Sequence, residues 1–160
     1  LSRVLPPATD PYYGWIIGSQ LYKLGRLTEA RTVLEAAVAK APGNEDLAME
    51  LAQVYVALKD YQAAAKILDG FVLAEQGVRY ETYLVAAQAA FSLGQYEKAL
   101  TILDKAVARH GSDIQLLDLI GDCYFKLGKK EEALAVWQKS LEINPDQPEL
   151  KKKIQAVKAK

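Results

Sequence analysis

The side chains that most often carry chemistry are scarce in this sequence of 160 residues. One cysteine, Cys123, and one histidine, His110, are present, which excludes an intrachain disulfide and a metal site of two histidines. A reactive thiol needs electropositive neighbours, and those of Cys123 are acidic, so we interpret it as a small residue packed between helices. We expect His110 in a turn. No glycine-rich phosphate loop, HExxH, CxxC or nucleophile elbow occurs. We therefore predict no catalytic, cofactor-binding or metal-ligating residue, and no enzyme activity.

Asp118 and Asp122 are the remaining candidates for chemistry, because two carboxylates four residues apart lie on one face of a helix. Three interpretations stay open at this point. The two residues could form an acid–base pair, they could bind a basic partner, or they could be solvated surface residues.

Charge and hydropathy exclude several classes of partner. The chain has 20 acidic and 20 basic residues, whereas a general nucleic-acid binder needs a basic face. The segment 147–160 holds five lysines and one glutamate, which leaves 15 basic and 19 acidic residues in the body. No apolar run approaches the 18 or so residues of a membrane span, so we expect neither nucleic-acid binding nor direct membrane insertion.

The first residue is Leu1, which suggests a processed or excised piece. The cysteine count fits a reducing compartment without excluding the periplasm. The sequence leaves open the cytoplasm, the periplasm, and attachment to a membrane through a segment outside this chain.

Internal repetition defines the elements that position these side chains. Four segments align at spacings of 34, 35 and 34 residues, and they begin at Leu24, Leu58, Leu93 and Leu127. Each has an alanine at one offset and a larger apolar residue four positions later; the pairs are Ala30 and Leu34, Ala64 and Leu68, Ala99 and Leu103, Ala133 and Trp137. Another segment with apolar residues every three or four positions precedes each of them. This spacing predicts pairs of amphipathic helices.

Turn and cap residues agree with paired helices. Three glycines follow the first helix of a pair, and we expect left-handed backbone there; they are Gly25, Gly94 and Gly128. The predicted N-caps are Asp10, Thr28, Asn44, Asp60, Ser112 or Asp113, and Asp146. Pro42 and Pro145 should close helices. Small residues such as Gly18 and Gly121 should let paired helices approach closely. Gly70 beside Phe71 predicts a local bend or an enlarged contact near 69–78.

This pattern resembles the tetratricopeptide repeat family. The residues of the last unit that carry the resemblance are Leu117, Ile120, Gly121, Tyr124, Ala133, Trp137, Ser140 and Pro145. The resemblance implies an all-α fold, a right-handed superhelical solenoid of antiparallel helix pairs whose first helices line a concave groove. The expected organisation is an extended lead over 1–10, four repeats over 11–147 (11–44, 45–79, 80–113 and 114–147), and a C-terminal capping helix over 148–160.

The two ends of such a solenoid differ. Leu150, Ile154 and Val157 fall on one face of the last helix and should cover the end of the repeats, with lysines in solvent. A membrane-surface or nucleic-acid contact is the alternative role of these lysines. No such cover precedes the first helix, whose start is crowded with apolar side chains. Either the proline-rich lead folds back over these side chains or they form a self-association surface; they are Tyr12, Tyr13, Trp15 and Ile16.

Register with the family places one set of residues in the groove. These residues are Trp15, Ser19, Tyr22, Met49, Gln53, Val56, Leu84, Gln88, Phe91, Asp118, Asp122 and Phe125, with Tyr12, Asp46, Glu81 and Gln115 in the same rows. Amide and hydroxyl side chains suit an extended peptide backbone, and the aromatic ones suit binding hot spots. The alternative is that these residues only pack between neighbouring helices. The groove lacks the basic cluster of repeats that bind acidic chaperone tails, so the expected partner is neutral to basic and partly apolar.

Two hypotheses of function follow. The first is a protein–protein interaction module that binds a peptide or helical segment of a partner in its groove, as part of an adaptor or assembly factor, by analogy a bacterial one. The second is a structural scaffold that self-associates, as a homo-oligomer, through the uncapped N-terminal end.

Overall fold

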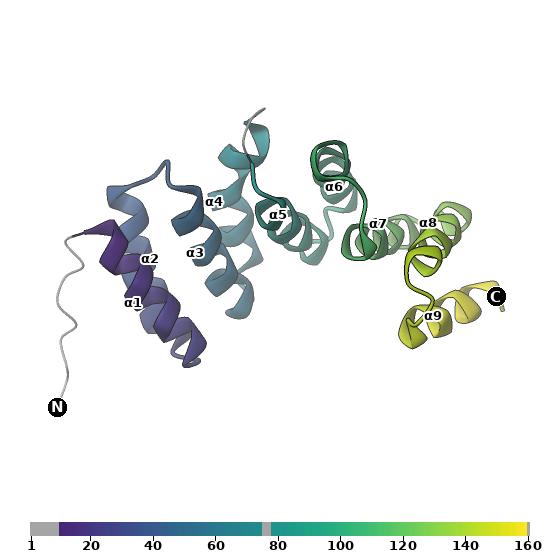
Figure 1. Cartoon of the computed structure of the whole chain (residues 1–160), viewed down its shortest axis with the longest axis horizontal. Helices are drawn as coiled ribbons and strands as arrows, with labels where there is room; N and C mark the ends of the chain where they lie inside the picture. The colour runs from purple at the N-terminus through teal and green to yellow at the C-terminus, as the bar shows by residue number, and fades with distance from the viewer. Residues whose placement is uncertain (1–9, 75–77, 160) are drawn as a thin grey trace. The chain divides into compact units, whose positions relative to one another are not determined.

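The computed structural model describes residues 10–74 and 78–159, and these residues fold into helices joined by short turns (Figure 1). The helices found there are α1 (Pro11–Lys23), α2 (Leu27–Lys40), α3 (Glu45–Ala57), α4 (Tyr61–Leu73), α5 (Tyr80–Ser92), α6 (Tyr96–His110), α7 (Ile114–Lys126), α8 (Lys130–Ile143) and α9 (Pro148–Lys158). Residues 10–74 and 78–159 contain no strand. The predicted all-α class of packed helix pairs is therefore confirmed. The predicted extended lead over 1–10 lies, except for Asp10, outside the described residues.

The chain forms two compact units, residues 1–85 and 86–160, and the division falls within α5. In the first unit, α1 packs against α2, α2 against α3, and α3 against α4. In the second unit, α6 packs against α7, α7 against α8, and α8 against α9.

The four turns inside the helix pairs share one geometry. Gly25, Gly94 and Gly128 have φ of +72°, +75° and +77°, and Lys59 occupies the equivalent position with φ +62°. In the first turn the Arg26 N–H donates to the Leu21 carbonyl at 2.9 Å, and the other three turns repeat this bond. This is the Schellman arrangement that ends a helix, so the prediction of left-handed glycines is confirmed.

Side-chain caps begin four of the helices. Asp10, Asn44, Asp60 and Asp113 each accept a hydrogen bond from a backbone N–H in the first turn of the following helix, as predicted. Thr28 was wrongly predicted as a cap, because α2 already begins at Leu27, directly after the turn.

The boundary of α9 also corrects the sequence analysis. Asp146 is not its cap, since the helix begins two residues later, at Pro148. The residues before Pro148 form the connection between α8 and α9. The side-chain amide of Gln147 holds this connection against α8 by donating to the Ser140 carbonyl at 3.0 Å. His110 is likewise not in a turn, because it is the last residue of α6. Pro42 and Pro145 do follow closely on the ends of α2 and α8.

Small residues set the approach of the paired helices. All four repeated alanines and the larger residues four positions on are fully buried. A Cβ added at Gly18 would overlap the Leu34 side chain, and one added at Gly121 would overlap the Trp137 indole. Close packing against a large side chain thus explains both glycines.

The α4 segment differs from its counterparts. Phe71 is half-buried where Ala37, Ala106 and Ser140 are fully buried, and Val72 is buried instead. The helix runs through Gly70 to Leu73, and a Cβ at Gly70 would meet nothing within 4 Å. Residues 75–77, where the predicted bend or contact continues, lie outside the described residues.

The last helix covers the end of the second unit. Leu150 and Ile154 are buried in a cluster with Ala133 and Trp137, and Val157 packs against the edge of this cluster. The predicted apolar face of α9 is therefore the face that packs.

Candidate functional site

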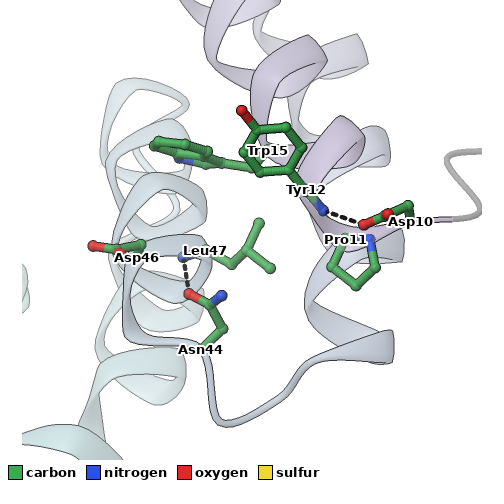
Figure 2. Close-up of a pocket in the computed structure, with 7 residues that line it drawn as sticks. All are labelled: Asp10, Pro11, Tyr12, Trp15, Asn44, Asp46 and Leu47. Atoms are coloured by element: carbon green, nitrogen blue, oxygen red, sulfur yellow. Dashed lines mark hydrogen bonds between the residues drawn. The ribbon is translucent and has the colours of Figure 1, made fainter.

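A cavity of about 340 Å³ lies between α1 and α3 of the first unit (Figure 2). It is lined by Asp10, Pro11, Tyr12, Trp15, Asn44, Asp46 and Leu47. The caps of the two helices fix its rim, because Asp10 accepts from the Tyr12 N–H at 2.8 Å and Asn44 accepts from the Leu47 N–H at 3.1 Å. The cavity therefore has a rigid frame of two helix starts.

Two aromatic rings form one wall of this cavity. The ring centroids of Tyr12 and Trp15 lie 6.2 Å apart at an interplanar angle of 50°. Tyr12 is 60% exposed and Trp15 is 38% exposed. Large apolar side chains with this exposure at the edge of a cavity are typical of a binding surface.

A second cavity, of about 280 Å³, adjoins the first at Trp15. Its lining residues are Trp15, Ile16, Ser19, Gln20, Lys23 and Glu50. The Ser19 hydroxyl oxygen is buried and has no hydrogen-bond partner among the described residues. A buried hydroxyl without a partner is unusual, and a ligand in the second cavity could supply one.

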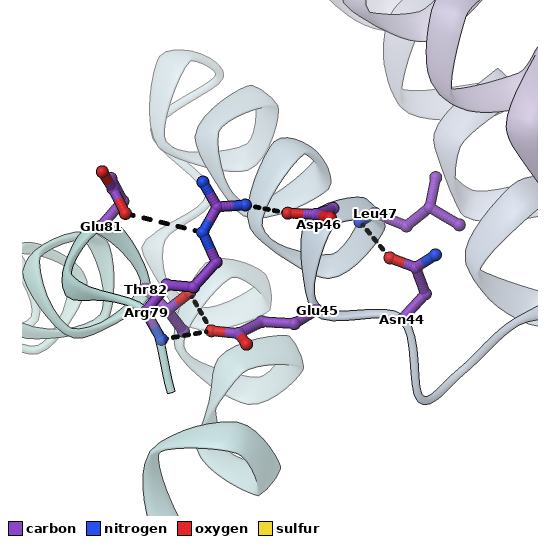
Figure 3. A network of polar contacts seen from close by, with 7 residues as sticks. All are labelled: Asn44, Glu45, Asp46, Leu47, Arg79, Glu81 and Thr82. Atoms are coloured by element: carbon purple, nitrogen blue, oxygen red, sulfur yellow. Dashed lines mark hydrogen bonds and ion pairs between the residues drawn. The ribbon is translucent and has the colours of Figure 1, made fainter. Parts of the chain in front are cut away.

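A polar network joins the start of α5 to α3, beside the first cavity (Figure 3). The Arg79 guanidinium pairs with the carboxylate of Asp46 and lies 3.7 Å from that of Glu81. Glu45 accepts from the Arg79 N–H at 2.9 Å and from the Thr82 hydroxyl at 2.6 Å. The carboxylate of Asp46 thus both lines the cavity and binds Arg79.

The predicted groove residues of the first unit do not all lie at the cavities. Trp15 and Ser19 do. Tyr22 instead packs against the core formed by α1, α2 and α3. Four other predicted groove residues are half-buried and line neither cavity; they are Met49, Gln53, Val56 and Leu84.

In the second unit, the predicted aromatic residues pair with neighbours. Phe91 is half-buried, with its ring edge-on to Tyr96 at 5.2 Å between centroids. Phe125 is 37% exposed and lies 5.8 Å from the ring of Trp137. Gln88 is exposed.

The two aspartates of α7 have different surroundings. Asp122 accepts a hydrogen bond from the Lys153 ammonium of α9 at 2.6 Å. One carboxylate oxygen of Asp118 is buried without a partner within the described part of the chain. Asp122 therefore already has a cation beside it, contributed by the capping helix.

The only cysteine of the sequence lies among buried side chains. Cys123 is fully buried, and its burial, together with the nearby Asp122 charge, raises the pKa of the thiol to about 12. Such a thiol is unreactive at neutral pH. Within residues 10–74 and 78–159, no three side chains of the metal-binding types gather into a site. The same part of the chain has no helix of the length and apolarity that crossing a bilayer requires.

Sequence reasoning missed part of the first cavity. It gave Asp10 and Asn44 only capping roles, and it assigned none to Leu47 or Arg79. The caps could have been used to predict this cavity. Helices α1 and α3 begin side by side, so their caps Asp10 and Asn44 lie close to one another. Arg79 gave no such signal, since its contact with Asp46 spans 33 residues.

Comparison with known proteins supports the repeat architecture. The tetratricopeptide repeat family model matches residues 21–81. The family model of anaphase-promoting complex, cyclosome, subunit 3 matches residues 72–140. Human (Homo sapiens) protein O-mannosyl-transferase TMTC1 is 26% identical over 138 residues, which are 82% of this chain. The chain spans only 15% of the length of that protein.

Solved structures of MamA share the fold. MamA MSR-1 (C2 form) is 25% identical with a TM-score of 0.78, over 86% of this chain and 79% of that one. MamA from Desulfovibrio magneticus RS-1 is 17% identical with a TM-score of 0.85, over 96% and 86%. With helix pairs that repeat every 34 or 35 residues, the family-model match shows that residues 21–81 of this chain consist of tetratricopeptide repeats.

Proposed function

We propose that this chain is a non-catalytic module that binds a peptide or helical segment of a partner protein on the face formed by α1 and α3. Tetratricopeptide repeat proteins generally mediate protein–protein interaction, which gives the class of function. The observation that supports the site is the pair of cavities that adjoin at Trp15.

The chemistry of these cavities suits a peptide. Trp15 is shared by both, so one aromatic anchor contacts ligand groups on either side. The Ser19 hydroxyl can both donate and accept, as a peptide backbone requires. The carboxylates of Asp46 and Glu50 favour a partner that is neutral to basic.

The proposal extends along the first helices of the later repeats. Predicted contacts there are Leu84, Gln88 and Phe91 of α5, and Asp118, Asp122 and Phe125 of α7. Met49, Gln53 and Val56 of α3 belong to the same proposed groove.

Selection from a phage-displayed library of random peptides on the intact chain tests this proposal. The dissociation constant of a selected peptide is then measured by fluorescence polarisation with the wild type and with Trp15→Ala. Loss of a central aromatic anchor should weaken binding about tenfold or more. Tyr61→Ala is the control, since Tyr61 is an aromatic residue of α4 that lines neither cavity. Equal weakening by both variants, or selection of no peptide, would contradict the proposal.

Self-association is the second candidate function, favoured by the exposure of the apolar start of α1. Tyr12 and Tyr13 are 60% exposed, and Ile16 joins Trp15 at 38%. In analytical ultracentrifugation a scaffold would show a mass that rises with concentration and falls on Tyr13→Asp. Tyr13 lines neither cavity, so this variant should leave peptide binding intact and separates the two functions.

A further inference from the structure

We propose that the cavity between α1 and α3 is a subsite for one cationic side chain, a lysine or an arginine of the bound partner. This inference rests on the proposed function and specifies the chemistry of its ligand. At about 340 Å³ the cavity lies at the lower end of the range of about 300–1,000 Å³ seen for ligand pockets. A lysine or arginine side chain therefore fits within this volume.

The aromatic wall supports a cation. Trp15 and Tyr12 present exposed rings, tilted 50° to each other, on the same side of the cavity (Figure 2). An ammonium or guanidinium group is attracted to the face of an aromatic ring, most strongly to tryptophan. The aliphatic stem of a lysine or arginine can pack on Pro11, an apolar lining residue that is half-buried.

The carboxylates add charge complementarity. Asp10 and Asp46 line the cavity, and Glu50 lies on the other side of Trp15. Glu45 and Glu81 join Asp46 in the network around Arg79. Against these five acids stand two basic side chains, Arg79 and Lys23, so the surroundings of the cavity carry a net negative charge.

An anionic ligand is disfavoured, although two helices start here. A helix N-terminus attracts anions through unbonded N–H groups. In α1, residue Pro11 has no N–H, and the N–H groups of Tyr12 and Gly14 donate to Asp10. In α3, those of Leu47 and Ala48 donate to Asn44. The cap side chains thus occupy one first-turn donor in each helix, and the carboxylates of Asp10 and Asp46 in the lining repel an anion.

The ion pair between Arg79 and Asp46 allows a test of the proposal by charge removal. Its guanidinium pairs with Asp46 from the chain's own α5 side, so it competes with an incoming cation for the same carboxylate (Figure 3). Removing the Asp46 charge should weaken binding of a cation, whereas removing the Arg79 charge should strengthen it. A cavity that recognised only apolar groups would respond to neither change.

The two tryptophans allow a direct measurement by nuclear magnetic resonance. Trp15 lines the cavity, whereas Trp137 is buried and its indole N–H donates to the Asp118 carbonyl at 3.4 Å. Nα-acetyl-lysine amide and Nα-acetyl-arginine amide are titrated into the ¹⁵N-labelled chain, and the two indole resonances are followed. We expect the Trp15 resonance to shift and that of Trp137 to stay. Nα-acetyl-norleucine amide, neutral and of similar shape, should shift neither.

Variants give the expected magnitudes. Asp46→Asn should weaken binding of the lysine derivative about two- to fivefold, and Arg79→Gln should strengthen it by a similar factor. Lys66→Gln, on the exposed side of α4, is the control with no expected effect. Equal shifts with the norleucine derivative, larger shifts with Nα-acetyl-glutamate amide, or no response to Asp46→Asn would overturn the proposal.

Selected peptides provide a second, independent measurement. Replacing each lysine or arginine of a bound peptide by norleucine should identify one position whose loss weakens binding to the wild type more than binding to Asp46→Asn. If peptides bind through Trp15 and no position behaves in this way, the cationic subsite is rejected while the proposed function stands. If no peptide binds but the lysine derivative shifts Trp15, the peptide-binding proposal fails instead.

Discussion

At the scale of single residues, the contrast between two helical glycines shows what the repeats require. A Cβ at Gly121 would overlap the Trp137 indole, whereas a Cβ at Gly70 would meet nothing. Gly121→Ala should therefore lower the free energy of unfolding by about 1–3 kcal/mol through overpacking. Gly70→Ala should raise it by about 0.5–1 kcal/mol, because alanine favours a helix interior. Thermal and urea denaturation measure both, and a matching loss of stability in the two variants would contradict this packing.

Lys59 adopts a backbone conformation that glycine has in the three equivalent turns, with φ +62°. A left-handed conformation costs a residue with a Cβ about 1–2 kcal/mol. Lys59→Gly should therefore raise the midpoint of unfolding, and Gly94→Ala, at φ +75°, should lower it. Urea denaturation of both variants measures these midpoints. Unaltered midpoints would show that left-handed backbone at these two positions has no energetic cost.

Two weakly acidic groups, the buried thiol of Cys123 and the half-buried hydroxyl of Tyr55, predict the response to alkaline pH. Burial raises the pKa of Cys123 from 9.0 to about 12. Burial, and then the hydrogen bond to Glu35, raises that of Tyr55 from 10.0 to about 12. Well below pH 9 both groups are protonated in the folded and in the unfolded state. Between pH 9 and 12 the unfolded chain loses these protons first, so the free energy of unfolding should fall with rising pH.

Urea denaturation at intervals from pH 8 to pH 10.5 checks this expectation. Cys123→Ala should show a shallower decline above pH 9 than the wild type, whatever its stability at pH 8. Identical slopes would mean that the thiol ionises equally easily in the folded chain.

At the scale of elements, α9 is the part whose removal should be most costly for the second unit. Ile154 is buried against a cluster that includes Trp137 and Ala133. Ile154→Ala should cost about 2–4 kcal/mol, while Lys151→Ala, on the exposed face, should cost little. The wavelength of tryptophan emission gives a second readout, because Trp137 would become exposed. An unchanged stability in Ile154→Ala would show that α9 does not cap the repeats.

How far elements could be predicted from sequence depends on what fixes each boundary. The glycines after α1, α5 and α7 and the caps Asp10, Asn44, Asp60 and Asp113 mark boundaries through local chemistry, and the structure agrees at each. Thr28 and Asp146 are equally good caps in isolation. Tertiary requirements decide against them, namely the tight Schellman turn before α2 and the extra residues needed to pass from α8 to α9.

The candidate site was predictable only in part, for a related reason. Register along a helix indicates which residues share a face, and it identified Trp15 and Ser19. It does not show which of those residues a neighbouring helix covers, and Tyr22 packs into the core. Nor does it reveal partners far apart in sequence, such as Arg79 beside Asp46 or Lys153 beside Asp122.

At the scale of the whole molecule, each of the two units carries a partly exposed aromatic residue among the proposed groove positions. Trp15 lies in the first unit and Phe125 in the second, and both are partly exposed. A selected peptide of about 14 residues spans up to about 45 Å when extended, so it can contact more than one repeat. Shortening it stepwise should weaken binding progressively, because each repeat contributes contacts of its own.

Single substitutions in each unit show which unit contacts a bound peptide. For the long peptide, Trp15→Ala and Phe125→Ala should each weaken binding. For a short peptide that keeps the cationic residue, only Trp15→Ala should do so. Higher salt should weaken both peptides, since charge attraction to the acidic cavity is screened. If Phe125→Ala leaves the long peptide unaffected while its helix content is retained, binding belongs to α1 and α3 alone, and the second unit serves another purpose.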